Sequence, residues 1–143
     1  VCCNLTNGRM PHLSNVKKNP PSPNVHQEGN VVFAKDVENH TLLGYKYFDF
    51  GDDFSSKTME LCLNVSGAGC DSTVHVLIDD YENGEEIGVC HVGMNDGEYK
   101  ARVKSVTGRH AVFFKVEHDY AGWFADAFKG RNLFDLKEFV FRK

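Results

Sequence analysis

The acidic residues and histidines of this chain do not form a catalytic pattern. Three adjacent acidic pairs come closest to the paired carboxylates of acid–base chemistry: Asp52-Asp53, Asp79-Asp80 and Glu85-Glu86. Neighbours on a strand point to opposite faces, so each pair is interpreted as a solvated turn. The histidines are isolated, and the chain has no Gly-rich phosphate loop, His-Glu-x-x-His motif or nucleophile elbow. We therefore expect no catalytic residue and no metal site.

Aromatic side chains are the more informative group. The stretch GYKYFDFGDDF, residues 44–54, carries Tyr45, Tyr47, Phe48 and Phe50. Strand alternation would place Tyr45, Tyr47 and Asp49 on one face and Lys46, Phe48 and Phe50 on the other. Such a concentration of rings favours burial, so most of them are expected in the core.

A second aromatic group surrounds the single tryptophan. Trp123 lies in DYAGWFADAF with Tyr120, Phe124 and Phe128, and no strand pattern buries them. Exposed aromatic clusters mark binding surfaces. Two interpretations remain open here: a platform on which a ligand stacks, or a contact with a neighbouring domain.

Composition and charge limit the possible functions. A chain of 143 residues with 41% hydrophobic and 25% charged residues is typical of one globular domain, residues 1–143. A formal net charge of −4, with scattered Lys and Arg, argues against a nucleic-acid partner. No apolar stretch approaches the roughly 20 residues that span a bilayer, so no membrane partner is expected.

The cysteines indicate a reducing compartment. There are five, and their spacing is neither that of a zinc site nor that of a disulfide framework. Cys62 and Cys70 could face each other across a hairpin, but free buried thiols are expected. With no initial Met and no signal peptide, the chain is expected to be part of a larger bacterial protein, cytoplasmic rather than secreted.

Hydrophobic periodicity predicts an all-β fold. In TMELCLNV, residues Met59, Leu61, Leu63 and Val65 alternate with polar positions, and STVHVLID repeats the pattern. Asn83-Gly84 stands between two such runs as a hairpin signal. Only WFADAFKG tolerates a helix. Seven or more short strands joined by Gly, Asn and Asp turns predict a β-sandwich, of the jelly-roll type.

The order and spacing of several segments resemble a known family. The segments are CCNLTNG, GYKYFDFG, STVHVLIDDYENGEEIGVCHV, and VTGRHAVFFKV followed by NLFDLKEFVF. Together they resemble family 6 carbohydrate-binding modules, especially those appended to the C-terminus of family 43 glycoside hydrolases of the xylosidase and arabinofuranosidase type. The resemblance covers most of the chain and implies a jelly roll, galactose-binding-domain-like.

The resemblance also implies a sugar site at the loop end of the sandwich. In the family two aromatic rings sandwich a sugar, and an Asn near the last strand binds its hydroxyls. The first aromatic position falls near Asp36, the second at Tyr99, and the Asn at Asp135. Asn39, in the same stretch as Asp36, is a further candidate, and Trp123 and Tyr120 are candidate substitute platforms.

The family's structural calcium ion, by the same resemblance, is not expected. The positions that match its ligands carry Cys2, Asn4 and Lys137, and an ammonium group repels a cation. We expect no cofactor.

The resulting functional hypothesis is a non-catalytic module of a plant-polysaccharide-degrading glycosidase that binds xylan- or arabinan-type chains weakly. The partners are then an oligo- or polysaccharide and a catalytic domain in the same polypeptide. The alternative is a structural accessory domain that packs on the catalytic domain and holds no glycan itself.

Overall fold

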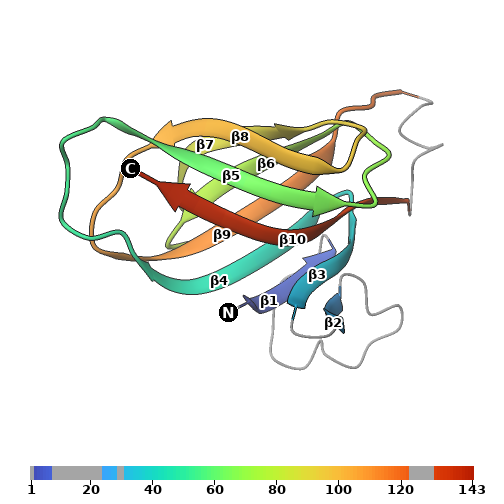
Figure 1. Cartoon of the computed structure of the whole chain (residues 1–143), viewed down its shortest axis with the longest axis horizontal. Helices are drawn as coiled ribbons and strands as arrows, with labels where there is room; N and C mark the ends of the chain where they lie inside the picture. Colours follow the sequence, from blue (N-terminus) through green and yellow to red (C-terminus); the bar gives the residue numbers. More distant parts are fainter. Residues whose placement is uncertain (1, 8–23, 29–30, 123–130) are drawn as a thin grey trace.

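The computed structural model describes residues 2–7, 24–28, 31–122 and 131–143, and the burial of side chains from residue 33 onward with the exception of Lys46. Two antiparallel sheets of five strands each make up the described chain (Figure 1). In sheet order the first contains β1 (Cys2–Asn7), β4 (Thr41–Asp49), β9 (Arg109–His118), β6 (Ser72–Ile78) and β7 (Glu85–Val92), and the second contains β2 (Asn24–Glu28), β3 (Val31–Glu38), β10 (Asn132–Arg142), β5 (Thr58–Ser66) and β8 (Gly97–Lys104).

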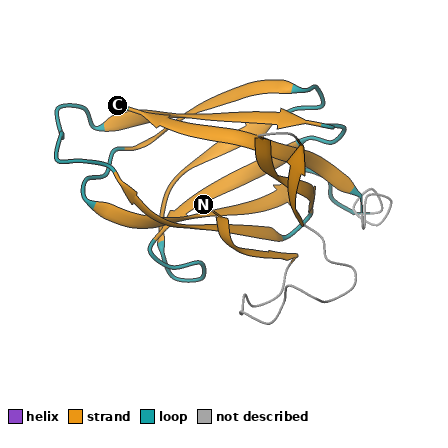
Figure 2. Ribbon diagram, turned by 60° about the horizontal axis from the view of Figure 1, so that its bottom comes forward, coloured by secondary structure: helices purple, strands orange, loops and turns teal. Residues whose placement is uncertain are grey.

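The prediction of an all-β sandwich of jelly-roll type is confirmed. The described residues contain strands and connecting loops but no helix, and none of their segments could cross a membrane as a helix (Figure 2). The segment WFADAFKG, which tolerates a helix and contains Trp123, lies outside the described residues.

Strand alternation places the core between the sheets. On β5, Met59, Leu61, Leu63 and Val65 are buried, and on β6 Val74, Val76 and Ile78 are buried while His75 points outward. Cys62 is an exception, because it is buried although it stands on the polar side of β5. Burial of these apolar side chains between the sheets stabilises the fold.

A β-bulge makes the predicted faces of β4 wrong. Tyr45 pairs with Val112 of β9 but Phe48 pairs with His110, so two residues of β4 oppose a single residue of β9. Tyr47 has a positive φ of 51° and its side chain is 60% exposed, whereas Tyr45 is buried. The extra residue brings Tyr45 and Phe48 to the same side of the sheet.

The bulge completes a cluster of aromatic rings between β4 and β10. Phe48 lies 5.4 Å from Phe139, and Phe50 lies 5.2 Å from Phe141, measured between ring centroids. Tyr45 lies 4.7 Å from the same Phe139 ring. Three of the four rings in GYKYFDFG thus pack in or against the core, as expected, and each buried Phe contributes roughly 1.5–3 kcal/mol.

The described cysteines are free thiols, as expected. Cys62, Cys70 and Cys90 are buried and form no disulfide. Burial raises the pKa of the Cys90 thiol to about 11, so this group stays neutral at physiological pH. The side chains of Cys2 and Cys3 lie outside the description.

The loop from β6 to β7 is longer than a two-residue hairpin. It runs over residues 79–84, and the Asp80 carboxylate accepts backbone hydrogen bonds from Glu82 and Asn83 at 2.7 and 2.9 Å. Gly84 permits the close return, since a Cβ there would lie 2.1 Å from the Asp80 carbonyl oxygen. Asn83-Gly84 therefore closes a wider turn stabilised by Asp80.

A histidine bridges two loops at this same end of the sandwich. His110 Nδ1 lies 2.9 Å from Asp79 Oδ2, and Nε2 lies 2.7 Å from the Thr107 carbonyl oxygen. Both ring nitrogens face acceptors, which favours the imidazolium form. The hydrogen bond to Asp79 raises the pKa of His110, burial opposes the shift, and the Thr107 carbonyl and the charge of Glu85 add to it.

This bridge predicts a pH-dependent stability. The pKa of His110 is higher in the folded chain than its ordinary value of 6.5, so the stabilisation is complete below that value. It is lost as pH rises through the folded pKa. The variant His110→Gln should lower the thermal midpoint by a few degrees at pH ~5, and its difference from the wild type should shrink as the pH rises above 6.5. A difference that does not change with pH would contradict the charged bridge.

Candidate functional site

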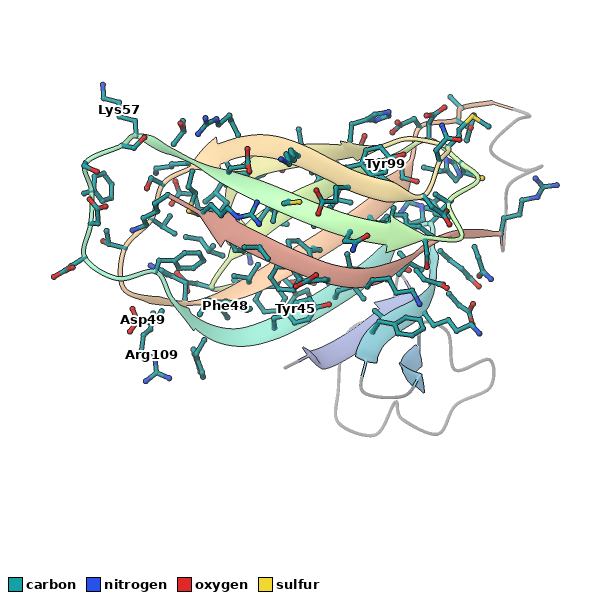
Figure 3. All side chains as sticks on the ribbon, viewed as in Figure 1. Tyr45, Phe48, Asp49, Lys57, Tyr99 and Arg109 are labelled. Carbon is teal, nitrogen blue, oxygen red and sulfur yellow. The ribbon has the colours of Figure 1, made fainter. Side chains whose placement is uncertain are left out.

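Four loops meet at one end of the sandwich because every described strand pair is antiparallel. The connections from β3 to β4, β5 to β6, β7 to β8 and β9 to β10 all lie there. We call this the loop end, and Figure 3 shows Tyr99 near it, with Asp49, Lys57 and Arg109 at the opposite end. All of the described candidate sugar-binding residues, Asp36, Asn39, Tyr99, Tyr120 and Asp135, lie on the strands or loops of this end.

Asp36 and Asp135 are brought together by a second bulge. Val37 pairs with Phe134 and Ala34 pairs with Leu136, so β3 carries one more residue than β10 between these pairs. Asp36 adopts a positive φ of 62°, a conformation that Asp tolerates better than most residues. The Asp135 carboxylate accepts a hydrogen bond from the Asp36 backbone N–H at 2.9 Å, and thereby satisfies a donor next to the bulge.

Neighbouring polar groups extend this pair. The Asn132 side-chain amide donates to Asp36 Oδ1 at 3.1 Å. Gly67 stands on the other side, where an added Cβ would lie 3.8 Å from Asp135 Oδ2. The arrangement presents carboxylate and amide groups that can accept from and donate to hydroxyl groups. The sequence analysis did not single out Asn132, although it is the first residue of the quoted segment NLFDLKEFVF, because nothing in the sequence shows that its side chain reaches Asp36.

Tyr99 stands on β8, against the loop that precedes it. Its hydroxyl donates to the Asn95 carbonyl oxygen and accepts from the Asn95 backbone N–H at 3.3 Å. Its ring packs against Gly93, where an added Cβ would lie 3.3 Å from the hydroxyl oxygen. Tyr99 is half-buried, so part of its ring is available at the surface while its hydroxyl secures the β7–β8 loop.

Tyr120 has a comparable position after β9. Its hydroxyl accepts a hydrogen bond from the Asp71 backbone N–H at 3.3 Å, and its ring centroid lies 5.9 Å from that of His118. The ring packs partly against the core. Tyr120 therefore ties the β9–β10 loop to the β5–β6 loop. Like Tyr99, it stabilises a loop through its hydroxyl and is not an isolated exposed ring.

A histidine between two carboxylates, beside Tyr120, was not identified from the sequence. His91 lies 3.2 Å from Asp119 and 3.6 Å from Asp71, and the Thr73 hydroxyl donates to Asp119 at 2.7 Å. These residues are scattered over β6, β7 and two loops, and only the sheet brings them together. Among the described residues, no group of three or more His, Cys, Asp or Glu side chains is arranged to hold a metal ion.

Asn39 and Lys137 have structural contacts. The Asn39 side-chain oxygen accepts from the His118 backbone N–H at 3.0 Å, which joins the β3–β4 turn to β9. The Lys137 ammonium lies 3.2 Å from the centroid of the Phe33 ring, in a cation–π contact. The position that the resemblance assigns to a calcium ligand thus carries a positive charge.

The hydrogen bond from Asp36 to Asp135 yields a stability prediction. Asp135→Ala should cost about 1–3 kcal/mol, because the N–H of a strained residue loses its acceptor. Asp135→Asn retains an acceptor oxygen and should cost less. Urea unfolding measures both free energies, and hydrogen exchange of the Asp36 amide should accelerate in the alanine variant alone. Equal stability of the two variants would contradict this role.

The sequence itself matches no protein-family model and no curated protein. Solved structures do match. The module CsCBM6-3 from Clostridium stercorarium, in complex with cellobiose, has a TM-score of 0.61 and 18% identity over 85% of this chain and 84% of that chain. A family 6 carbohydrate-binding module from Clostridium cellulolyticum, in complex with xylose, has a TM-score of 0.59 and 22% identity over 84% and 86% of the two chains.

A larger enzyme also contains this architecture. The chain matches a family 43 arabinoxylan arabinofuranohydrolase from Bacillus subtilis, in complex with cellotetraose, with a TM-score of 0.59 and 20% identity. The match covers 85% of this chain but only 23% of the enzyme chain. At these identities the likeness establishes the architecture: the chain has the jelly-roll β-sandwich fold of family 6 carbohydrate-binding modules.

Proposed function

We propose that this chain is a non-catalytic carbohydrate-binding module that binds xylan- or arabinan-type chains weakly at the loop end. The observation that carries the proposal is its fold, which it shares with modules whose structures hold cellobiose and xylose. The absence of a catalytic motif in the sequence agrees with a binding role, and the loop end gathers two tyrosines with several polar side chains.

The chemistry of the loop end suits a sugar. A pyranose has C–H faces that stack on an aromatic ring and hydroxyl groups that need fixed polar partners. The partly exposed ring of Tyr99 offers a stacking surface. The carboxylates of Asp36 and Asp135 and the amide of Asn132 offer polar partners for hydroxyl groups. Stacking on one ring contributes about 0.5–1.5 kcal/mol of binding free energy in addition to the burial of apolar area. A dissociation constant of about 1 mM already requires roughly 4 kcal/mol, so binding through a single ring is weak.

The proposed parent is a bacterial glycosidase of the xylosidase or arabinofuranosidase type, with this module in the same polypeptide. The B. subtilis arabinofuranohydrolase supports this assignment, because a matching module forms part of its longer chain. Three free buried thiols agree with a cytoplasmic location.

A specific observation favours a second candidate function, a structural accessory domain that binds no glycan. The hydroxyls of Tyr99 and Tyr120 are both hydrogen-bonded to the backbone of the loops, at Asn95 and Asp71. Rings used in this way stabilise the loop end itself. In this alternative the loop end, with Trp123 outside the described residues, contacts a catalytic domain.

Affinity electrophoresis on soluble xylan and arabinan separates the two functions. The binding function predicts retardation of the wild type, with the dissociation constant raised about tenfold in Tyr99→Ala or Trp123→Ala by loss of a stacked ring. Phe54→Ala is the matched control, since Phe54 is an exposed ring at the opposite end and should not affect retardation. Unretarded wild-type protein on both polysaccharides would reject the binding function and favour the structural one.

We also propose that the family's structural calcium ion is absent from this chain. Lys137 brings an ammonium group to a position where that ion would need an oxygen ligand. Excess calcium or a chelator should leave the thermal midpoint unchanged in a calorimetric scan. A rise in the midpoint of the wild type with calcium that a chelator reverses would contradict the proposal.

A further inference from the structure

The loop from β6 to β7 contains an asparagine whose side chain has no role in the turn. Asn83 is exposed, and its backbone N–H donates to Asp80 Oδ1 at 2.9 Å. Within the described part of the chain, its side-chain amide makes no hydrogen bond. The turn therefore uses the backbone of Asn83 and leaves the amide group able to rotate toward the next residue.

The next residue, Gly84, is required by the fold. An added Cβ would lie 2.1 Å from the Asp80 carbonyl oxygen and 2.4 Å from the Ile78 carbonyl oxygen. A larger residue would force the turn to move, so glycine is the residue that this close return permits. Glycine also leaves its own backbone nitrogen unshielded by a side chain. The residue that the turn needs is thus the one that gives the Asn83 amide an unhindered nucleophile.

We infer that Asn83 is a site of spontaneous covalent modification, at which the chain converts asparagine to aspartate and isoaspartate without an enzyme. The Gly84 backbone nitrogen gives up its proton to solvent and bonds to the side-chain carbonyl carbon of Asn83. The bond from that carbon to the side-chain nitrogen breaks, and the nitrogen takes a proton from solvent and leaves as ammonia. Water then opens the resulting succinimide ring at either carbonyl, and no atom changes its oxidation state.

A comparable pair on another loop is held differently. Asp96 also precedes a glycine, Gly97, but its Oδ1 accepts from the Ala68 backbone N–H at 2.9 Å. The carboxylate that would have to approach the Gly97 nitrogen is thus already bound to a neighbouring loop. A second Asn-Gly pair, Asn7-Gly8, lies partly outside the described residues, so an experiment has to detect Asn83 in a peptide of its own.

The two products affect the β6–β7 loop differently. Aspartate keeps the backbone as it is and adds a carboxylate between Glu82 and Glu85. Isoaspartate directs the chain through the former side chain, which adds a methylene group to the backbone. Since the turn has no room for a Cβ at Gly84, the longer backbone should break the two hydrogen bonds that Asp80 accepts. The isoaspartate form is therefore the less stable product.

Peptide mapping of the full chain after incubation at mildly alkaline pH tests the inference. We expect the peptide that contains Asn83 to gain the mass by which a carboxylic acid exceeds an amide. The same peptide should accept a methyl group from labelled S-adenosylmethionine in the presence of an isoaspartyl methyltransferase, which detects the isoaspartate product.

Two variants assign the signal to this residue. Asn83→Gln should lose both the mass gain and the methylation, because the larger ring closes far more slowly. Asn95→Gln makes the same change at another exposed asparagine, which precedes Asp96 instead of a glycine, and should leave both signals unchanged. An Asn83 peptide that keeps its amide after the incubation would overturn the inference, whether or not Asn7 reacts.

Thermal unfolding of the separated products tests the effect on the turn. The isoaspartate form should unfold a few degrees below the unmodified chain, because the Asp80 hydrogen bonds are lost. The variant Asn83→Asp, which reproduces the aspartate product, should shift the midpoint less, as an exposed substitution that keeps the backbone. An isoaspartate form as stable as the unmodified chain would contradict the strain assigned to the longer backbone.

Discussion

The pairing of β4 with β9 is the constraint on which the aromatic core depends. One extra residue between Tyr45 and Phe48 changes which side chains of β4 face the second sheet. Without it, Tyr45 would be buried and Phe48 would point to solvent, since successive residues on a strand face opposite sides. With it, Tyr45, Phe48 and Phe50 all reach the rings of β10, through two edge-to-face contacts and one tilted contact.

A bulge of the same kind occurs on β3, and a comparison of the two is informative. At Asp36 the left-handed residue is one that favours this conformation, and its N–H is bound by Asp135. At Tyr47 the left-handed residue is an exposed ring held beside Arg109. The first bulge is explained by local hydrogen bonding, whereas the choice of tyrosine at the second is not explained by the fold.

The loop end is built by hydrogen bonds between loops rather than by a hydrophobic cluster. The Asp96 side chain accepts from the Ala68 backbone N–H at 2.9 Å, Tyr120 joins two further loops, and Asn39 joins the β3–β4 turn to β9. Such cross-loop bonds reduce the conformational entropy that a ligand would otherwise have to remove on binding. They also occupy the tyrosine hydroxyls, so that ring surface and carboxylate oxygens are the groups left for the proposed binding of a glycan.

The sequence alone determined the elements with a regular period. Alternation on β5 and β6 identified their core faces, and the resemblance to a family placed Asp36, Tyr99 and Asp135 near the same end of the sandwich. The bulges could not be foreseen, because an extra residue is defined by the partner strand and neither Tyr47 nor Asp36 breaks the local pattern. Only the tertiary structure decided that Asp135 binds the Asp36 backbone and that Tyr47 meets Arg109, since each contact joins residues whose distance depends on strand register. It also decided that Tyr99 secures its own loop, because that contact depends on how the loop before β8 folds back on the strand.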